Sequence, residues 1–266
     1  MTAGFHTVWL DSVDSTNSEA LRRLPSLPSG TVLAAVEQTA GRGQRGNTWF
    51  SEPGKNLTFS VVLKSLDLPA AEAFRLNCLC SVAVSEFLDS FGVASLVKWP
   101  NDIYAGGRKI CGMLLENGLA KGSVAYSVMG IGINVNQMAF PNLANATSMA
   151  LEAARKGDAP EGASAFFSAT EGASPLERPK LDLVQCLDTF LEFLAKWLPQ
   201  LRSAELFDEY ERRLYRRGIS ARYHDMLKDE DFDGVIRGVD PDGRLCIEDA
   251  AGEIRRYYFK EVSYIL

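Results

Sequence analysis

The sequence is poor in the features that mark secreted, membrane and metal-binding proteins. Its 266 residues include two histidines, His6 and His224, too few for a histidine-based metal site or a Ser-His triad. The five cysteines form no CxxC pair, and an odd number without such pairs is typical of reduced thiols in the cytosol. No run approaches the ~18 uninterrupted apolar residues of a membrane-spanning helix, and the N-terminus lacks the basic start of a secretory signal. We therefore expect a soluble, cytoplasmic protein with no membrane partner.

An excess of positive charge is also missing. The chain has 28 Lys and Arg against 34 Asp and Glu, a net charge of −6, and its pI is about 5.1. An acidic balance argues against a protein that coats nucleic acid through bulk charge. The hydrophobic fraction of 46% is ordinary for a globular protein and allows a sizeable core.

Hydrophobic pattern and punctuation predict an α/β chain of the α+β type. Short runs rich in Val, Ile and Leu and bounded by Gly or Pro predict strands at 7–10, 31–37, 57–63, 96–98, 110–116 and 124–134. A first helix is predicted to begin at residues 15–17. Further helical patterns cover residues 70–90, 181–198 and 204–215. We expect a mixed β-sheet flanked by helices.

The C-terminal part has a different pattern. Four short alternating runs at 220–223, 232–239, 245–248 and 255–259, with Gly-containing turns at 240–243 and 250–252, predict a small SH3-like β-barrel. We place a catalytic domain at 1–217 and the barrel at 218–266. Within the first, residues 158–179 are rich in Ala, Ser, Gly, Glu and Pro and are interpreted as a mobile insertion.

A glycine-rich loop follows the predicted strand at 31–37. Gly41, Gly43 and Gly46 match GxGxxG, but the dinucleotide-binding form of this motif needs a helix directly afterwards. Residues 47–54 contain Asn, Pro and Gly and lead to another strand. We therefore reject a Rossmann interpretation.

Two arginines and an indole remain in this loop. Arg42 and Arg45 suit phosphate or carboxylate oxygens, and free glycine NH groups can form an anion nest. Trp49 follows a few residues later, and the sequence around it predicts an exposed indole. The alternative is a solvated hairpin tip without a ligand.

A second cluster surrounds a predicted Gly106-Gly107 hairpin turn. Pro100 ends the strand before it, which leaves Asn101 and Asp102 at the strand edge, where their oxygens could reach Mg²⁺. Lys109 begins an otherwise apolar strand. A lone lysine there is commonly a surface residue, whereas one that points into a pocket would supply positive charge for developing anionic oxygens.

Two polar groups have structural as well as functional interpretations. Asn134 and Asn136 alternate with apolar residues and would share one strand face, as turn-forming residues or as ligands of a metal or phosphate. Residues 15–17, Ser-Thr-Asn, read as a helix N-cap or as a binding motif.

Taken together and in this order, these segments resemble biotin–protein ligase (biotin–[acetyl-CoA-carboxylase] ligase). The resemblance is strong over residues 6–136 and extends to the barrel by pattern only. The matching pieces are Asp14-Ser15-Thr16-Asn17, Gln38-Thr39-Ala40-Gly41-Arg42-Gly43 with Trp49, Lys98-Trp99-Pro100-Asn101-Asp102, Arg108-Lys109-Ile110-Cys111-Gly112 and Gly130-Ile131-Gly132-Ile133-Asn134.

The resemblance implies a two-step, ATP-dependent ligation. Biotin attacks the α-phosphate of MgATP to give biotinyl-5′-AMP and pyrophosphate, and a lysine of a biotin carboxyl carrier domain then displaces AMP. Mg²⁺, ATP and biotin are the implied cofactor and substrates. A carboxylate that meets a triphosphate needs positive charge more than a general base.

The resemblance also implies roles for individual residues. The catalytic residues would be Lys109, Arg42 and Asp102, and Asp102 with Asn134 would lie on the metal and phosphate side. The implied biotin-binding residues are Ser15, Thr16, Asn17, Gln38, Arg42, Gly43, Gln44, Lys109 and Gly112. The implied ATP- and adenylate-binding residues are Arg45, Trp49, Lys109 and Asn134, with Trp49 stacked on adenine and Gly112 leaving room for the ligand.

Two departures from the family pattern stand out. Many members carry Arg where this chain has Gln44, and that Arg helps to retain the adenylate, so we expect weaker retention here unless Arg45 compensates. Few residues precede the Ser-Thr-Asn motif, too few for the winged helix-turn-helix of regulatory members. We therefore expect the ligase-only class, without DNA binding, as a monomer or homodimer.

Two other functions remain as alternatives. A lipoate or octanoyl ligase or transferase shares the broad catalytic fold but would use a different acyl pocket. A non-catalytic biotin- or partner-binding protein has no reason to combine Lys109, Asp102 and an arginine-rich loop.

Overall fold

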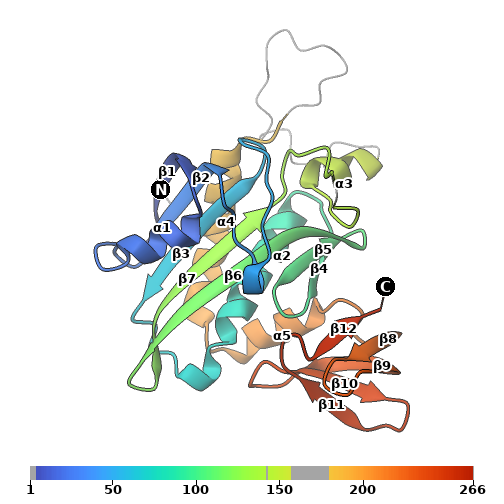
Figure 1. Ribbon diagram of the computed structural model, residues 1–266. Helices are drawn as coiled ribbons and strands as arrows, with labels where there is room; N and C mark the ends of the chain where they lie inside the picture. Colours follow the sequence, from blue (N-terminus) through green and yellow to red (C-terminus); the bar gives the residue numbers. More distant parts are fainter. Residues whose placement is uncertain (1–3, 142, 157–179, 266) are drawn as a thin grey trace.

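The chain folds around a seven-stranded sheet (Figure 1). The computed structural model describes residues 4–141, 143–156 and 180–265, so the insertion predicted at 158–179 lies outside the described residues. The strand order is β1-β2-β3-β7-β6-β5-β4. The strands are β1 (His6–Val13), β2 (Thr31–Gln38), β3 (Leu57–Lys64), β4 (Ser95–Lys98), β5 (Asp102–Ala105), β6 (Arg108–Ala120) and β7 (Ser123–Ile133).

The sheet is mixed because one neighbouring pair is parallel. β1 pairs with β2 in parallel, joined by the crossover helix α1 (Thr16–Arg23), and the other pairs are antiparallel. This confirms the predicted fold class. The short strand β5 is absent from the predicted strands, although the Gly106-Gly107 turn that joins it to β6 was expected.

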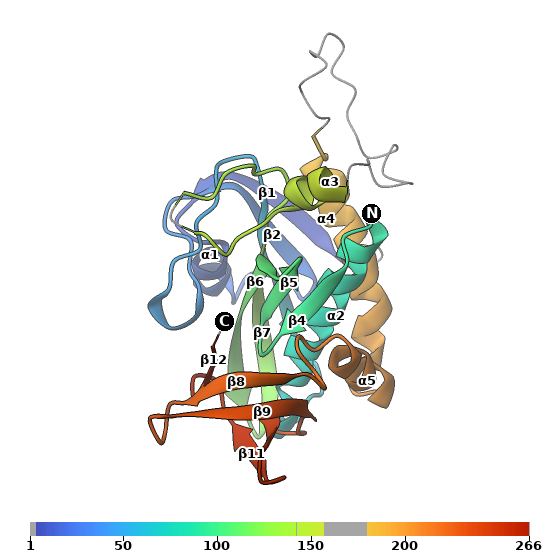
Figure 2. The same cartoon turned by 90° about the vertical axis from the view of Figure 1, so that its right-hand side faces the viewer.

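The two faces of the sheet carry different helices, as Figure 2 shows. Because side chains alternate along a strand, Phe59 and Val62 of β3 point to opposite faces. Phe59 packs on Phe190 of α4 (Leu183–Trp197), with ring centroids 5.1 Å apart, in the large core that also includes α2 (Arg75–Ser90) and α5 (Ala204–Arg212). Val62 belongs to the small cluster under α1. The face under α1 is the one that carries the polar side chains described below.

Two helix predictions need correction, and one helix was not predicted. The helix expected at 70–90 is interrupted: a 3₁₀ turn at Ala70–Glu72 precedes α2. The helix expected to reach residue 215 ends at Arg212. The sequence pattern missed α3 (Met149–Lys156) altogether. No helix among the described residues is long and apolar enough to cross a membrane.

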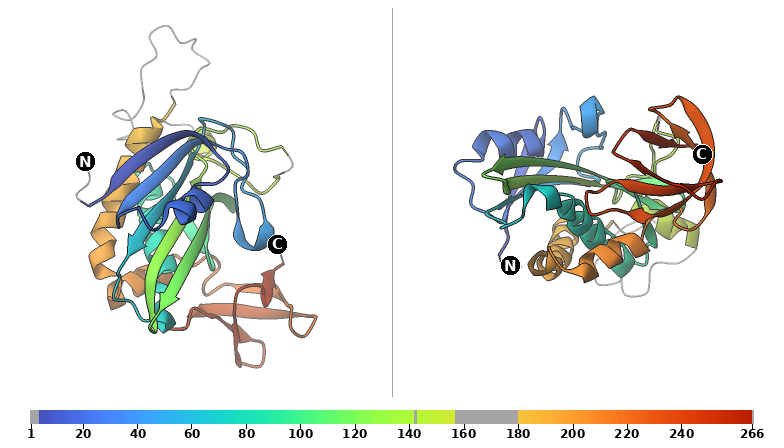
Figure 3. Two further views of the ribbon diagram at one scale, coloured as in Figure 1. Left: turned by 60° about the vertical axis from the view of Figure 1, so that its left-hand side comes forward. Right: turned by 90° about the horizontal axis from the view of Figure 1, so that it is seen from below.

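A five-stranded antiparallel sheet forms the C-terminal part (Figure 3). Its strands are β8 (Ser220–Asp225), β9 (Glu230–Val239), β10 (Leu245–Asp249), β11 (Ile254–Tyr257) and β12 (Val262–Tyr264), in the order β11-β10-β9-β8-β12. Four of them match predicted strands, and the three-residue β12 was missed. The boundary at 217/218 stays a prediction.

The two sheets contact each other through a few specific bonds. Trp99 Nε1 donates to Gly243 O in the turn between β9 and β10 at 3.0 Å, and Tyr215 N, in the segment that leads into β8, donates to Val97 O at 2.8 Å. Trp99 follows β4 and is buried, so these bonds bring the C-terminal sheet against the edge of the seven-stranded sheet where Asp102 and Lys98 lie.

Candidate active site

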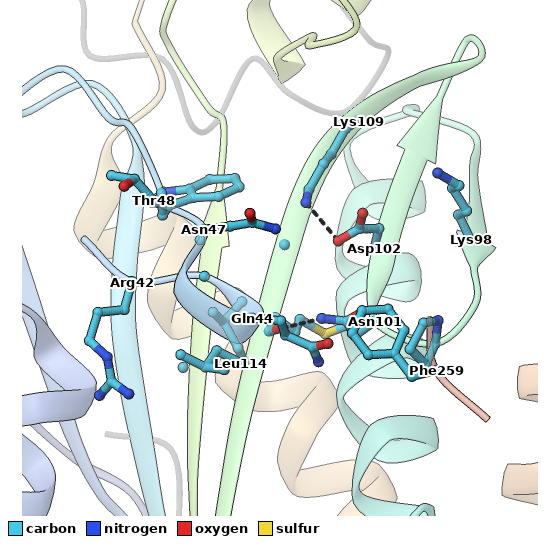
Figure 4. Close-up of a pocket in the computed structure, with 18 of the residues that line it drawn as sticks. Arg42, Gln44, Asn47, Thr48, Lys98, Asn101, Asp102, Lys109, Leu114 and Phe259 are labelled. Atoms are coloured by element: carbon cyan, nitrogen blue, oxygen red, sulfur yellow. Dashed lines mark hydrogen bonds and ion pairs between the residues drawn. The ribbon is translucent and has the colours of Figure 1, made fainter. Parts of the chain in front are cut away.

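A cavity of about 420 Å³ lies where α1, the glycine-rich loop, β4–β7 and the C-terminal sheet meet (Figure 4). Its volume falls in the range of small-molecule sites. Most of the predicted site residues line it: Ser15, Thr16, Asn17, Gln38, Arg42, Gly43, Gln44, Trp49, Asp102, Lys109 and Gly112. Segments from Ser15 near the N-terminus to Tyr264 near the C-terminus therefore contribute to one cavity.

A buried hydrogen-bond network forms one end of the cavity. Thr16 donates to Gln38 Oε1 through its backbone N at 2.8 Å and through Oγ1 at 3.1 Å. Ser60 Oγ lies 2.7 Å from Thr16 Oγ1 and 2.6 Å from Asn17 Oδ1. Ser15 occupies the N-cap position of α1, yet its side chain makes no capping bond. The Thr16 and Asn17 side chains thus join this network, and their predicted contact with biotin stays a prediction.

Sequence reasoning missed Ser60. The signal was a serine in the apolar run 57–63, and β3 pairs place it on the face under α1. A glycine is required opposite this network, because a Cβ at Gly130 would lie 2.2 Å from Asn17 Oδ1. The small residue at 130 therefore lets the Asn17 amide approach the sheet.

The Arg42 guanidinium contacts a carboxylate rather than open space. Its Nη2 lies 2.9 Å from Glu116 Oε1 and its Nη1 lies 3.2 Å from Glu116 Oε2. Figure 4 shows the guanidinium turned away from Lys109. Glu116 Oε2 also accepts from Asn17 Nδ2 at 2.9 Å. One carboxylate thus joins the arginine-bearing loop to the buried network, and the predicted contact of Arg42 with a ligand stays a prediction.

The glycine-rich loop folds back on itself as a hairpin-like loop. Arg42 and Thr48 form an antiparallel bridge, with a 3₁₀ turn at Gln44–Gly46 between them. Gly43 N donates to Asn47 O at 2.7 Å, so this NH is not free for an anion as the nest interpretation required. The hairpin expected as an alternative is present, and its residues line the cavity.

Trp49 lies on a platform of two glycines. A Cβ at Gly132 would lie 2.4 Å from Trp49 Cε2, and a Cβ at Gly112 would lie 2.9 Å from Trp49 Cζ3. The indole therefore fills the space that the sequence interpretation left for a ligand above Gly112. Its buried Nε1 has no acceptor among the described residues.

Lys109 and Asp102 form an ion pair in the cavity wall. Lys109 Nζ lies 2.7 Å from Asp102 Oδ1, and their side chains are 34% and 25% exposed. The ammonium also lies 5.8 Å from the Trp49 ring centroid. Lys109 is therefore not the surface lysine of the alternative interpretation. Its side chain faces the cavity between Trp49 and Asp102.

Lys98 is a further cavity residue to which the sequence interpretation gave no role. Lys98 belongs to β4 and lies next to Asp102 of β5. Its Nζ donates to Tyr104 OH at 3.2 Å. Burial lowers the pKa of the Lys98 amine, while Asp102 acts in the opposite direction. The same burial raises the pKa of Tyr104.

Three predicted polar residues are not seen in the cavity wall. Asn134 is buried outside the lining, where its Nδ2 donates to Thr147 O at 2.9 Å. Asn136 binds the backbone of Leu181 at both ends of its amide, a structural role. The side chain of Arg45 is outside the described part of the chain. The ligand roles of Asn134 and Arg45 stay predictions.

A bound metal would have few protein ligands here. Among the described residues, no group of three or more His, Cys, Asp and Glu could hold a metal ion, and Asp102 is the one carboxylate in the described lining. Mg²⁺ commonly binds one or two carboxylates together with substrate phosphates. Asp102 fits that arrangement, whereas Asn134, whose Oδ1 is buried and unpartnered in the described structure, is not among the described residues that line the cavity.

The fold and this site match one class of enzymes. Residues 9–134 match the model of the biotin/lipoate A/B protein ligase family, and residues 226–263 match the biotin protein ligase C-terminal domain. The first match contains the cavity segments from α1 to β7, and the second contains most of the C-terminal sheet.

Individual relatives and solved structures show similarity to the biotin protein ligases within this class. The chain is 31% identical to the bifunctional ligase/repressor BirA of Escherichia coli over 96% of its own length and 72% of that protein. It is 29% identical to the biotin–[acetyl-CoA-carboxylase] ligase of Mycobacterium tuberculosis, covering 88% of this chain and 80% of that one. The biotin protein ligase of Aquifex aeolicus in complex with biotin and ATP superposes with a TM-score of 0.72 at 25% identity, covering 97% of both chains. The chain belongs to the biotin protein ligase family.

Proposed function

We propose that this protein activates biotin with ATP and transfers it to a protein lysine. A biotin carboxylate oxygen forms a bond to the α-phosphorus of ATP, and the bond to the β-phosphate oxygen breaks to release pyrophosphate. The neutral ε-amine of an acceptor lysine then attacks the carbonyl carbon of biotinyl-5′-AMP. The new amide forms as AMP leaves and the amine loses a proton.

One observation carries this proposal: a single cavity joins an uncharged hydrogen-bonding end to a cationic end. Thr16, Asn17 and Gln38 supply the uncharged end, and Lys109 supplies the cation. Biotin has the same polarity, with a neutral ureido head and an anionic tail. The relative from Aquifex aeolicus, whose structure contains biotin and ATP, supports the same pairing of ligands.

Charge is the central problem of the first step, because carboxylate and triphosphate repel each other. Lys109 Nζ stands beside Trp49, so an adenosine stacked on the indole would bring its α-phosphate to the ammonium. A fixed cation stabilises the charge that develops on the phosphoryl oxygens in the transition state. Asp102 holds the ammonium in place until the anionic substrates arrive.

Mg²⁺ is part of the proposal, with Asp102 as its protein ligand. When bound, it neutralises charge on the phosphate oxygens. Asp102 is also proposed to orient the acceptor amine by accepting a hydrogen bond from it. The acceptor is proposed to be the biotin carboxyl carrier domain of a carboxylase, since relatives are named biotin–[acetyl-CoA-carboxylase] ligases.

Mass spectrometry under native conditions tests the proposal. Protein incubated with biotin and MgATP is expected to carry the mass of biotinyl-5′-AMP, and protein incubated with either substrate alone is not. Adenylate formation with lipoate or octanoate in preference to biotin would favour the lipoate-type alternative. Biotin binding without an adenylate would show a binding protein instead.

A further inference from the structure

Lys98 stands at the junction of the two sheets, inside the cavity. It is the last residue of β4, directly opposite Asp102 in the β4–β5 register. Its Nζ lies 5.0 Å from the ring centroid of Tyr104 and 5.1 Å from that of Tyr264. Tyr104 belongs to β5 and Tyr264 to β12, so one ring comes from each sheet.

Lys98 makes no close ion pair with a carboxylate of the described residues, although Asp102 lies opposite it and acts on its charge. Arg42 is paired with Glu116 and Lys109 with Asp102, but no carboxylate of the described residues lies within 4.0 Å of Lys98 Nζ. Aromatic faces compensate a cation only in part, and burial of an unpaired charge is unfavourable. A partly buried ammonium without a close ion pair therefore favours an anion supplied by a ligand.

The order of groups along the wall indicates which anion that is. Figure 4 shows Lys109, Asp102 and Lys98 side by side, with Lys109 on the side nearer the loop that carries Thr48 and Lys98 on the far side. Trp49 lies next to Lys109, the position proposed for the nucleotide and its α-phosphate. With the nucleotide in that position, the remaining phosphates of ATP would extend past Asp102 toward Lys98.

We infer that Lys98 binds the β- and γ-phosphates of ATP and the pyrophosphate that leaves, and that Tyr264 positions its ammonium. The inference rests on the proposed function and adds a residue for the triphosphate. It also gives the C-terminal sheet a part in the first step, because Tyr264 comes from β12. The Tyr264 ring packs on Tyr223 at 5.6 Å, which fixes it against the rest of that sheet.

Biotin-dependent exchange of labelled pyrophosphate into ATP separates the substrates. Lys98→Met keeps the stem of the side chain and removes the charge. We expect it to raise the KM for pyrophosphate and for ATP by about 10- to 100-fold, the loss typical of a hydrogen bond to a charged group. The KM for biotin should change less than about twofold, and Lys98→Arg should recover most of the affinity for pyrophosphate.

Two comparisons make the outcome specific. Lys121→Met removes a lysine from the β6–β7 turn, which does not line the cavity, and should behave as the wild type. Tyr264→Leu keeps Lys98 and removes one ring, so the KM for pyrophosphate should rise by about fivefold. Lys98→Gln serves as a second neutral variant, and thermal unfolding shows that each variant is folded.

The possible results distinguish this inference from the proposed function. No biotin-dependent exchange by the wild type would contradict the proposed function. Exchange by the wild type together with an unchanged KM for pyrophosphate in both neutral variants would overturn the role of Lys98 alone. An equal rise in the KM values of biotin and ATP would also overturn it, because a general structural defect would affect both.

Discussion

The ammonium of Lys109 lies 2.7 Å from a carboxylate oxygen of Asp102 on the neighbouring strand. The pair crosses β5 and β6 beside an irregularity in their register, between Ile103 and Tyr104. Such bulges re-aim side chains next to functional sites. The consequence is a lysine that faces a cavity although it lies near the start of a strand with apolar residues.

Loss of this lysine should impair adenylation far more than biotin binding. Lys109→Ala is expected to slow adenylate formation by roughly 10²–10³-fold, as for the loss of one donor to a developing anion. Single-turnover measurement of biotinyl-5′-AMP formation checks this. A normal rate would refute the catalytic assignment. Lys121→Met is the matched control, since it removes an exposed lysine of the same sheet.

Removal of the Trp49 ring should weaken ATP binding selectively. Stacking of a base on an aromatic side chain contributes about 1–3 kcal/mol. Trp49→Ala is therefore expected to raise the KM for ATP by about 5- to 150-fold while the KM for biotin changes much less. Unchanged ATP affinity would show that the indole only packs on its glycines.

Gly132 can be tested through the indole that rests on it. A Cβ at this position would lie 2.4 Å from Trp49 Cε2, so Gly132→Ala must displace the ring and raise the KM for ATP. In a Trp49→Ala background the clash is gone, and the same substitution should have little further effect. Steady-state kinetics of the four proteins forms a double-mutant cycle. Additive effects would contradict the proposed contact.

The ion pair with Glu116 should hold Arg42 and its loop in the position that favours biotin binding. Glu116→Gln can still accept a hydrogen bond from Asn17 but loses the two-point ion pair with Arg42. A half-exposed ion pair contributes about 1 kcal/mol, so we expect a rise of about fivefold in the KM for biotin. Glu72→Gln, which breaks the ion pairs of Glu72 with Arg75 and Arg202 outside the cavity lining, is the control. Equal kinetics of the two variants would rule out the role of Glu116.

Gln44 should weaken retention of the adenylate. It lines the cavity from the 3₁₀ turn of the loop, where an arginine would add a positive charge beside an anionic ligand. Gln44→Arg is expected to slow dissociation of biotinyl-5′-AMP, measured by stopped-flow chase with unlabelled ligand. A dissociation rate of the variant equal to or faster than that of the wild type would contradict this.

The sequence was informative where unusual residues interrupt a pattern. Lys109 in an apolar strand and Trp49 in a glycine-rich loop stand out without coordinates, and the cavity brings both together. Partners distant in sequence could not be foreseen. Glu116 is 74 residues from Arg42, and nothing in its own segment distinguishes it from an exposed acid on a strand.

Short elements and the facing of strand residues also could not be predicted from the sequence. β12 has three residues, too few for an alternating pattern, yet it supplies Tyr264 to the cavity. Ser60 and Lys98 look like ordinary strand residues until the register shows which face each occupies. Helix α3 follows a polar segment, and its eight residues are near the shortest length that periodicity can detect.

The structure of the protein with biotin and a non-hydrolysable ATP analogue tests most directly whether one cavity brings the two anions together at Lys109. We expect the carboxylate of biotin and the α-phosphate both to lie within hydrogen-bond distance of Lys109 Nζ, with the ureido head at Thr16 and Asn17. A complex with biotin or the nucleotide bound away from this ammonium would contradict that claim.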